Sequence, residues 1–291
     1  MEDKMINKEQ FFNMYKIDEE ELKKENISWE DLKEIHDDFI DSKKSYETQA
    51  DLIANILRAQ PKVHSVKTRV KNVSHLIEKV IRKTPERRAK YGQEFNFTAE
   101  NYKDEITDLL GIRVIHIFKE DWEEINNFIT NMWDVMEIVA NVREGDDTRK
   151  FDEQGIAVCS RPSGYRSVHY LIESYPTNKK LITEVQVRTI FEEGYGEIDH
   201  QLRYSHEDIP ELLGQNLMLL NRIAGSSDEM ASLINRLSQS IQEVENKFKE
   251  KINEKDKKIE GIKEKIYDKE SISDIDKKNL IDEIDDILKI Q

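Results

Sequence analysis

Between about residues 63 and 190, short runs rich in β-branched residues alternate with stretches in which apolar residues have helical spacing. The runs are HSVKTRV (64–70), GIRVIHIF (111–118), VMEIVANV (135–142), SVHYLIES (167–174) and LITEVQV (181–187). The helical stretches lie at about residues 72–83, 99–110 and 119–132. This alternation predicts an α+β domain with a mixed five-stranded sheet flanked by helices.

Helical spacing of apolar residues also marks both flanks of this region. Residues 1–60 have the pattern of two or three amphipathic helices, and the pattern returns after about residue 190. From Met230 to Phe248, apolar residues recur at alternating intervals of four and three, as in a coiled-coil seam. We expect N-terminal helices at 1–60, the α+β domain at 61–206 and a helical, coiled-coil-like region at 207–291. Self-association through the helical regions and antiparallel packing of the seam against the N-terminal helices both stay open.

The overall charge restricts the class of partner. The chain has 45 Lys and Arg residues against 60 Asp and Glu residues, a formal net charge of −15. This balance argues against a protein that coats DNA or an anionic membrane. No run of about 18 apolar residues is present, and the N-terminus MEDKMINKEQ lacks the apolar segment of a signal peptide. We expect a cytoplasmic protein, and the single cysteine, Cys159, excludes an internal disulfide.

One segment reverses the charge. Residues 58–90 carry a net charge of +9, so the rest of the chain carries −24. Arg69 and Lys71 lie two apart on a predicted strand and therefore share a face. Asn72 or Ser74 then begins a helix whose cations recur at helical spacing. An exposed, solvated helix face is one interpretation, and a site for a polyphosphate is the other.

Two carboxylates are placed to complete such a site. Asp108 lies at the end of the helix predicted at 99–110, just before the strand GIRVIHIF, and Glu184 lies on the predicted strand LITEVQVR. Strand alternation puts Glu184, Gln186 and Arg188 on one face of that strand and two valines on the other. Carboxylates that lie beside phosphates can hold Mg²⁺. A strand at the sheet edge with surface ion pairs is the alternative.

The residues above belong to blocks that resemble a known family. TRVKNVSHLIEK (68–79), DLLGIRVI (108–115), RPSGYRSVHY (161–170), EVQVRT (184–189) and YGEIDHQLRY (195–204) resemble the synthetase domain of the RelA/SpoT family, in particular its small alarmone synthetases. The resemblance implies a mixed sheet related to that of nucleotidyltransferases. It also implies a GTP pyrophosphokinase that uses Mg²⁺ to move the pyrophosphate of ATP to the 3′-hydroxyl of GDP or GTP, with release of AMP.

The resemblance also implies roles for individual residues. In the ATP site, Arg69 and Arg113 would enclose the adenine. The phosphates would be bound by Lys71, Ser74, Lys79 and Arg82. Asp108 would bind Mg²⁺, and Glu184 would activate the 3′-hydroxyl or share the metal. In the acceptor site, Arg161 would bind phosphates, Tyr165 would stack on guanine and His169 would line the pocket, with Gln186 beside Glu184.

Two other functions stay open. A related toxin-type enzyme would transfer pyrophosphate to the 3′ CCA end of tRNA, and Arg87, Arg88 and Lys90 could supply the cationic surface that tRNA binding needs. A catalytically idle sensor of guanine nucleotides would keep the binding residues and use the helical tail as its output. Neither DNA nor a membrane is an expected partner.

Overall fold

The computed structural model describes residues 8–205, 210–271 and 273–289. Three helices begin the chain: α1 (Lys8–Tyr15), α2 (Glu19–Lys24) and α3 (Trp29–Arg58). The Ser28 hydroxyl caps α3 by accepting hydrogen bonds from the N–H groups of Glu30 and Asp31. One face of α3 is buried at residues such as Ile35 and Phe39. The helices predicted for residues 1–60 are therefore confirmed from Lys8 onward, and residues 1–7 lie outside the described residues.

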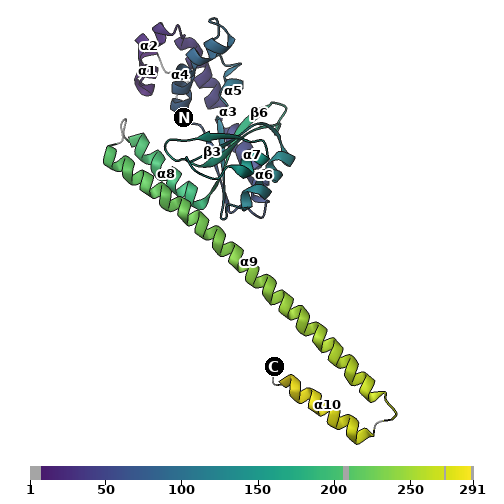
Figure 1. The fold of residues 1–291 in the computed structure, drawn as a ribbon. Helices are drawn as coiled ribbons and strands as arrows, with labels where there is room; N and C mark the ends of the chain where they lie inside the picture. The colour runs from purple at the N-terminus through teal and green to yellow at the C-terminus, as the bar shows by residue number, and fades with distance from the viewer. Residues whose placement is uncertain (1–7, 206–209, 272, 290–291) are drawn as a thin grey trace. The chain divides into compact units, whose positions relative to one another are not determined.

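The centre of the fold is a mixed sheet of six strands (Figure 1). The strands are β1 (Ser65–Val70), β2 (Leu110–His116), β3 (Asp134–Val142), β4 (Ala157–Ser160), β5 (Ser167–Ser174) and β6 (Leu181–Thr189). Their order across the sheet is β1-β2-β6-β5-β3-β4. The pairs β2/β6 and β3/β4 are parallel, and the other neighbours are antiparallel. The prediction of a mixed sheet between helices is confirmed.

The predicted number of strands was wrong by one. The missed strand, β4, lies in residues 141–164, between the third and fourth predicted strands. This segment is polar, and its sequence pattern indicates a long loop; the structure forms β4 and the short helix α7 (Arg149–Glu153) there. β4 has only four residues, pairs with β3 alone and is largely exposed. The apolar run IAVC (156–159) is short and stands inside a polar segment, so the sequence pattern does not distinguish this edge strand from a loop.

The helices around the sheet are α4 (Val73–Tyr91), α5 (Tyr102–Glu105) and α6 (Asp121–Met132). Asn72 is the N-cap of α4, and its side chain accepts a hydrogen bond from the N–H of Ser74 at 2.9 Å. The helix predicted at 72–83 continues to Tyr91. The helix predicted at 99–110 is wrong for most of its length, because only one turn forms before the chain enters β2.

The two faces of the sheet differ in character. The core face carries buried residues such as Ile112, Tyr170, Val185 and Val187. α6 covers part of this face, where the Trp122 indole N–H donates to the Tyr170 hydroxyl at 3.0 Å. Glu184 and Gln186 alternate with the buried valines and therefore lie on the opposite face, as predicted. We call this opposite face the polar face.

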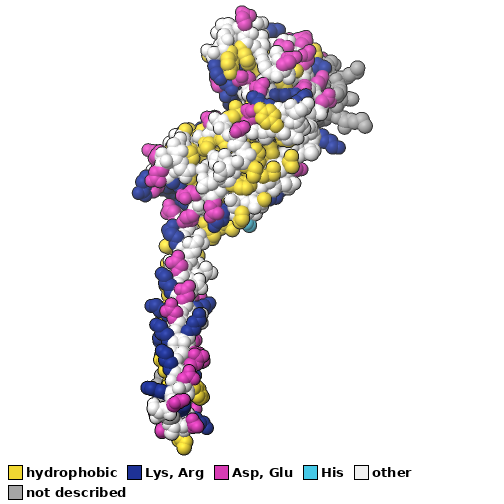
Figure 2. All heavy atoms as spheres, turned by 90° about the vertical axis from the view of Figure 1, so that its right-hand side faces the viewer, with side chains coloured by type: hydrophobic (Ala, Val, Ile, Leu, Met, Phe, Trp, Pro, Cys, Tyr) yellow, Lys and Arg dark blue, Asp and Glu magenta, His cyan; other side chains and the backbone are white. Residues whose placement is uncertain are grey.

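Three helices end the chain: α8 (Ile190–Ser205), α9 (Glu211–Tyr267) and α10 (Asp274–Lys289). The chain divides into two compact units, residues 1–232 and 233–291. In the second unit, the Lys263 ammonium pairs with Asp285 at 2.6 Å, and the apolar seam from Ile234 to Phe248 is exposed. Basic and acidic side chains are interspersed along α9 (Figure 2). None of the helices described has both the length and the apolar character needed to cross a membrane.

A buried carboxyl group on α9 makes stability depend on pH. Asp228 is 1% exposed. Burial raises the pKa of Asp228 to about 7, Glu192 acts in the same direction and the Thr189 hydroxyl opposes both. Between pH 3.8 and about 7, the Asp228 carboxyl is protonated in the folded protein and ionised in the unfolded chain. The stability of the fold therefore falls as the pH rises through this range.

We expect Asp228→Asn to raise the melting temperature by about 3 °C or more at about pH 8, because the variant has no charge to bury. At about pH 5 the wild-type carboxyl is already neutral in the folded state, so the two proteins should differ much less. Thermal unfolding of both proteins in matched buffers measures the difference. An equal change at both pH values would contradict the assignment.

Candidate functional site

A cavity of about 380 Å³ opens on the polar face, above β1, β2 and β6. Its lining contains six of the twelve predicted site residues: Arg69, Lys71, Asp108, Arg113, Glu184 and Gln186. Cross-strand pairing explains why they meet. Gly111 lies between Arg69 on β1 and Glu184 on β6, and in the next row Arg113 lies between Lys67 and Gln186. The glycine leaves the space between the cation and the carboxylate free of a side chain.

Two lysines converge on Asp108. The Lys71 and Lys79 ammonium groups each lie 2.8 Å from Oδ2 of Asp108. Lys71 follows β1, and its N–H donates to the Leu109 carbonyl at 2.9 Å, which fixes it beside Asp108. Burial by itself raises the pKa of Asp108, but the two lysines outweigh it and hold that pKa below its usual value. Asp108 is therefore ionised at neutral pH.

Ser74 and Arg82 lie on α4 and are not among the residues that line this cavity. The Ser74 hydroxyl donates to the Asn72 side chain at 2.7 Å, at the N-terminus of the helix. Arg82 is exposed. Their predicted contacts with phosphate stay predictions.

Glu184 is held by a chain of polar groups. Its Oε2 accepts a hydrogen bond from the Gln186 amide at 2.7 Å, and its Oε1 lies 3.4 Å from Nδ1 of His169. The other ring nitrogen of His169 lies 3.0 Å from the Tyr165 hydroxyl. Burial acts to raise the pKa of Glu184, but His169 and Gln186 outweigh it and lower that pKa. Four predicted residues thus form one connected set.

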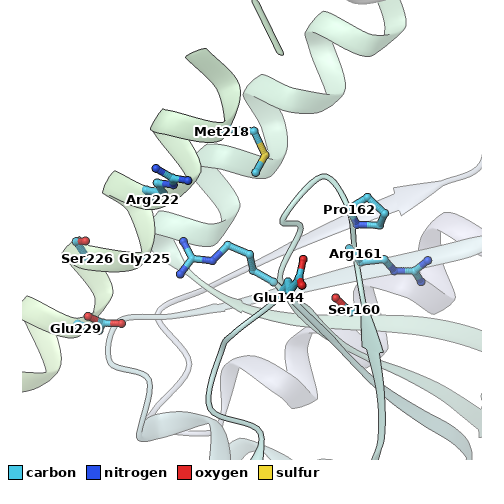
Figure 3. A pocket seen from close by; sticks show the side chains of 10 residues that line it. Glu144, Ser160, Arg161, Pro162, Met218, Arg222, Gly225, Ser226 and Glu229 are labelled. Atoms are coloured by element: carbon cyan, nitrogen blue, oxygen red, sulfur yellow. The ribbon is translucent and has the colours of Figure 1, made fainter. Parts of the chain in front are cut away.

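Arg161 lies at a second cavity, of about 660 Å³, rather than in the lining of the first. Its Nε donates to the Asn141 side chain at 2.5 Å. Figure 3 shows Met218, Arg222 and Glu229 of α9 on one side of this cavity and the loop with Arg161 and Pro162 on the other. The predicted contact between Arg161 and phosphates stays a prediction.

A buried ion cluster beside the first cavity was missed by the sequence analysis. Glu193 on α8 is 5% exposed, and its carboxylate lies 2.9 Å from Lys67, 3.5 Å from Arg113 and 3.2 Å from Arg188. Arg188 also donates to the Tyr165 hydroxyl at 2.9 Å. The only sequence signal was that Arg188 shares a strand face with Glu184, because Glu193 meets its partners through long-range packing.

Two of the three cations suggested for tRNA binding, Arg87 and Arg88, are engaged within the fold. The Arg87 guanidinium pairs with Glu105 at 2.6 Å. Arg88 is buried, and its side chain donates to main-chain carbonyls of Glu25, Asn26 and Phe95. Lys90 donates to the neighbouring Tyr91 hydroxyl. Of this trio, Lys90 alone is exposed and could contribute to the cationic surface that the tRNA hypothesis needs.

Comparison with known proteins identifies the region around these cavities. Residues 68–209 match a family model described as a "Region found in RelA / SpoT proteins". This part of the chain is a RelA/SpoT synthetase region. All twelve predicted site residues lie within its bounds.

Individual relatives of the RelA/SpoT region are distant. The GTP pyrophosphokinase YwaC of Bacillus subtilis is 25% identical over 181 residues, which cover 60% of this chain and 75% of the relative. The crystal structure of small alarmone synthetase 1 from Bacillus subtilis has a TM-score of 0.52 and 21% identity, covering 67% of this chain and 94% of that one. The structure of the same enzyme bound to its product pppGpp has a TM-score of 0.50 and the same identity and coverage. These structures establish the fold.

The RelA/SpoT region has a carboxylate arrangement that fits Mg²⁺. Both lysines contact Oδ2 of Asp108, and Oδ1 of this residue is buried with no hydrogen-bond partner among the described residues. Glu184 lines the same cavity. In the described part of the chain, no group of three or more His, Cys, Asp or Glu side chains could hold a metal by itself. Two carboxylates are enough for Mg²⁺ when phosphates supply further oxygens.

Proposed function

We propose that this protein transfers the β,γ-pyrophosphate of ATP to the 3′-hydroxyl of GDP or GTP and releases AMP. The observation that most directly supports this proposal is that one cavity combines a lysine-paired Asp108 with a second ionised carboxylate, Glu184. The names of the relatives support the substrates: YwaC is a GTP pyrophosphokinase, and small alarmone synthetase 1 was crystallised with its product pppGpp.

ATP would bind above β1 and β2. Arg69 and Arg113 offer flat guanidinium groups on the polar face, which suit stacking against adenine. Lys71 and Lys79 would bind the phosphates together with the helix N-terminus at Ser74 and with Arg82. Asp108 and Glu184 would hold Mg²⁺, which neutralises charge on the phosphates. As the phosphates bind, the lysines would exchange their contact with Asp108 for contacts with the nucleotide.

The acceptor would bind above β5 and β6. Tyr165 would stack on guanine, His169 and Gln186 would line the pocket, and Arg161 would bind phosphates. The 3′-oxygen attacks the β-phosphorus of ATP, the bond from that phosphorus to the α-phosphate oxygen breaks, and AMP leaves. Glu184 takes the hydroxyl proton. Its lowered pKa leaves it ionised before the reaction, and fixed cations offset the charge that develops on the transferred group.

Labelled ATP tests this proposal. The full-length protein is incubated with Mg²⁺ and γ-labelled ATP, and separately with GDP, GTP, ATP or tRNA. We expect label in the product of GDP or GTP and one AMP released for each transfer. With α-labelled ATP, the label should appear in AMP and not in the acceptor, and chelation of Mg²⁺ should stop both reactions. Label in tRNA alone would favour the toxin-type reaction, and nucleotide binding without AMP would favour a sensor.

A further inference from the structure

The loop of residues 161–166, here called the acceptor loop, connects β4 to β5 and carries Arg161 and Tyr165. Two helices outside the sheet hold this loop. The Tyr195 hydroxyl on α8 donates to the Ser163 carbonyl at 2.6 Å. The larger contribution comes from α9, whose first turns lie in the same compact unit as the loop.

A single buried amide on α9 forms hydrogen bonds with both residues that flank Tyr165 in the chain. Asn221 is 1% exposed. Its Nδ2 donates to the Gly164 carbonyl at 2.8 Å, and its Oδ1 accepts a hydrogen bond from the Arg166 guanidinium at 3.1 Å. The Gly164 carbonyl belongs to the peptide bond that leads into Tyr165. Because that bond is planar, fixing its oxygen limits the backbone of Tyr165.

Close packing leaves the loop little freedom to shift. Gly164 has a φ of +74°, and a Cβ there would lie 2.9 Å from the Asn221 side chain. Arg166 is buried and makes two hydrogen bonds to Asp146, at 2.6 and 3.1 Å. A Cβ at Gly225 of α9 would lie 3.1 Å from the Arg166 guanidinium. The amide of Asn221 therefore sits where only a side chain that both donates and accepts satisfies its neighbours.

We propose that Asn221 is a positioning residue for the acceptor: through Gly164 and Arg166 it holds Tyr165 in the orientation that binds the guanine base. This inference rests on the proposed function. It assigns part of the acceptor site to α9, which lies outside the matched RelA/SpoT region. Among the described residues, the hydrogen bonds of Asn221 go to Gly164 and Arg166 and not to a residue assigned to ATP, so Asn221 should act on the acceptor alone.

The test compares Asn221→Ala with Asn216→Ala in the full-length protein. Asn216 is an exposed asparagine on the same helix, and its amide donates to the Leu212 carbonyl one turn earlier. We expect Asn221→Ala to raise the KM for GDP and GTP about tenfold, the scale of a lost buried hydrogen bond, with the KM for ATP changed less than about twofold. Asn216→Ala should leave both constants unchanged. Asn221→Asp keeps an acceptor for Arg166 but cannot donate to Gly164. Its KM for GDP and GTP should therefore lie between the values of Asn216→Ala and Asn221→Ala.

Hydrogen exchange of the full-length protein without nucleotide gives a second measurement. Amides of residues 161–167 should exchange faster in Asn221→Ala than in Asn216→Ala, while those of β6 stay protected. Equal exchange in the two variants, or an equal rise in both KM values, would overturn the inference. If the wild type transfers pyrophosphate to no acceptor, the proposed function fails, and the exchange data alone decide whether Asn221 holds the loop.

Discussion

Glu184→Gln is expected to reduce pyrophosphate transfer by about a thousandfold or more while the protein stays folded, because an amide cannot take the 3′-hydroxyl proton. The substitution keeps the shape of the side chain. It also preserves an oxygen that can accept the hydrogen bond from Gln186. Initial rates of AMP release at saturating ATP and acceptor measure the effect.

The matched control is Glu123→Gln, an exposed residue of α6 on the core side of the sheet. This variant should retain wild-type rates. Asp108→Asn should also lose transfer, since it removes the charge that pairs with Lys71 and Lys79. Melting temperatures of all three variants should show that folding is intact. Wild-type rates in both Glu184→Gln and Asp108→Asn would disprove the proposed chemistry.

The sequence predicted the parts of the fold that depend on local patterns. The alternation in LITEVQV placed Val185 and Val187 in the core and Glu184 and Gln186 on the other face, because a strand has only two faces. Asn72 was one of two predicted helix starts, and it is the N-cap of α4. β4 was missed because its apolar run, IAVC, is only four residues long and stands inside a polar segment.

In the candidate site, too, the sequence predicted some contacts and not those that depend on tertiary packing. Lys71 and Asp108 are 37 residues apart in the sequence. The resemblance to the RelA/SpoT family assigned both to the ATP site, and in the structure they are in contact. The Glu193 cluster and the contacts of Asn221 depend on how α8 and α9 pack against the sheet. Neither residue differs locally from many other polar residues on a helix, so the sequence pattern could not single them out. Tertiary packing alone gives them partners.

The buried position of Glu193 leads to the second large effect. Glu193→Gln leaves Lys67, Arg113 and Arg188 without their shared carboxylate, and Arg188 is itself only 3% exposed. Removing one partner of a buried ion pair is strongly destabilising, so we expect a loss of about 3 kcal/mol in the free energy of unfolding. Lys67 is 57% exposed and should contribute little to this loss. Denaturant unfolding measures it.

The dependence on pH separates this charge effect from a packing defect. Burial acts to raise the pKa of Glu193, but Lys67, Arg188 and Arg113 outweigh it and hold that pKa below 4.5. The ionised Glu193 carboxylate therefore stabilises the fold fully above pH 4.5, and this stabilisation is lost as the pH falls through the lowered pKa of Glu193. Wild type and Glu193→Gln should converge in stability in that acidic range. Glu197→Gln, which removes a half-exposed partner of Arg113 alone, should cost less than about 1 kcal/mol. A difference between wild type and Glu193→Gln that is independent of pH would mean that the shape of the side chain matters and its charge does not.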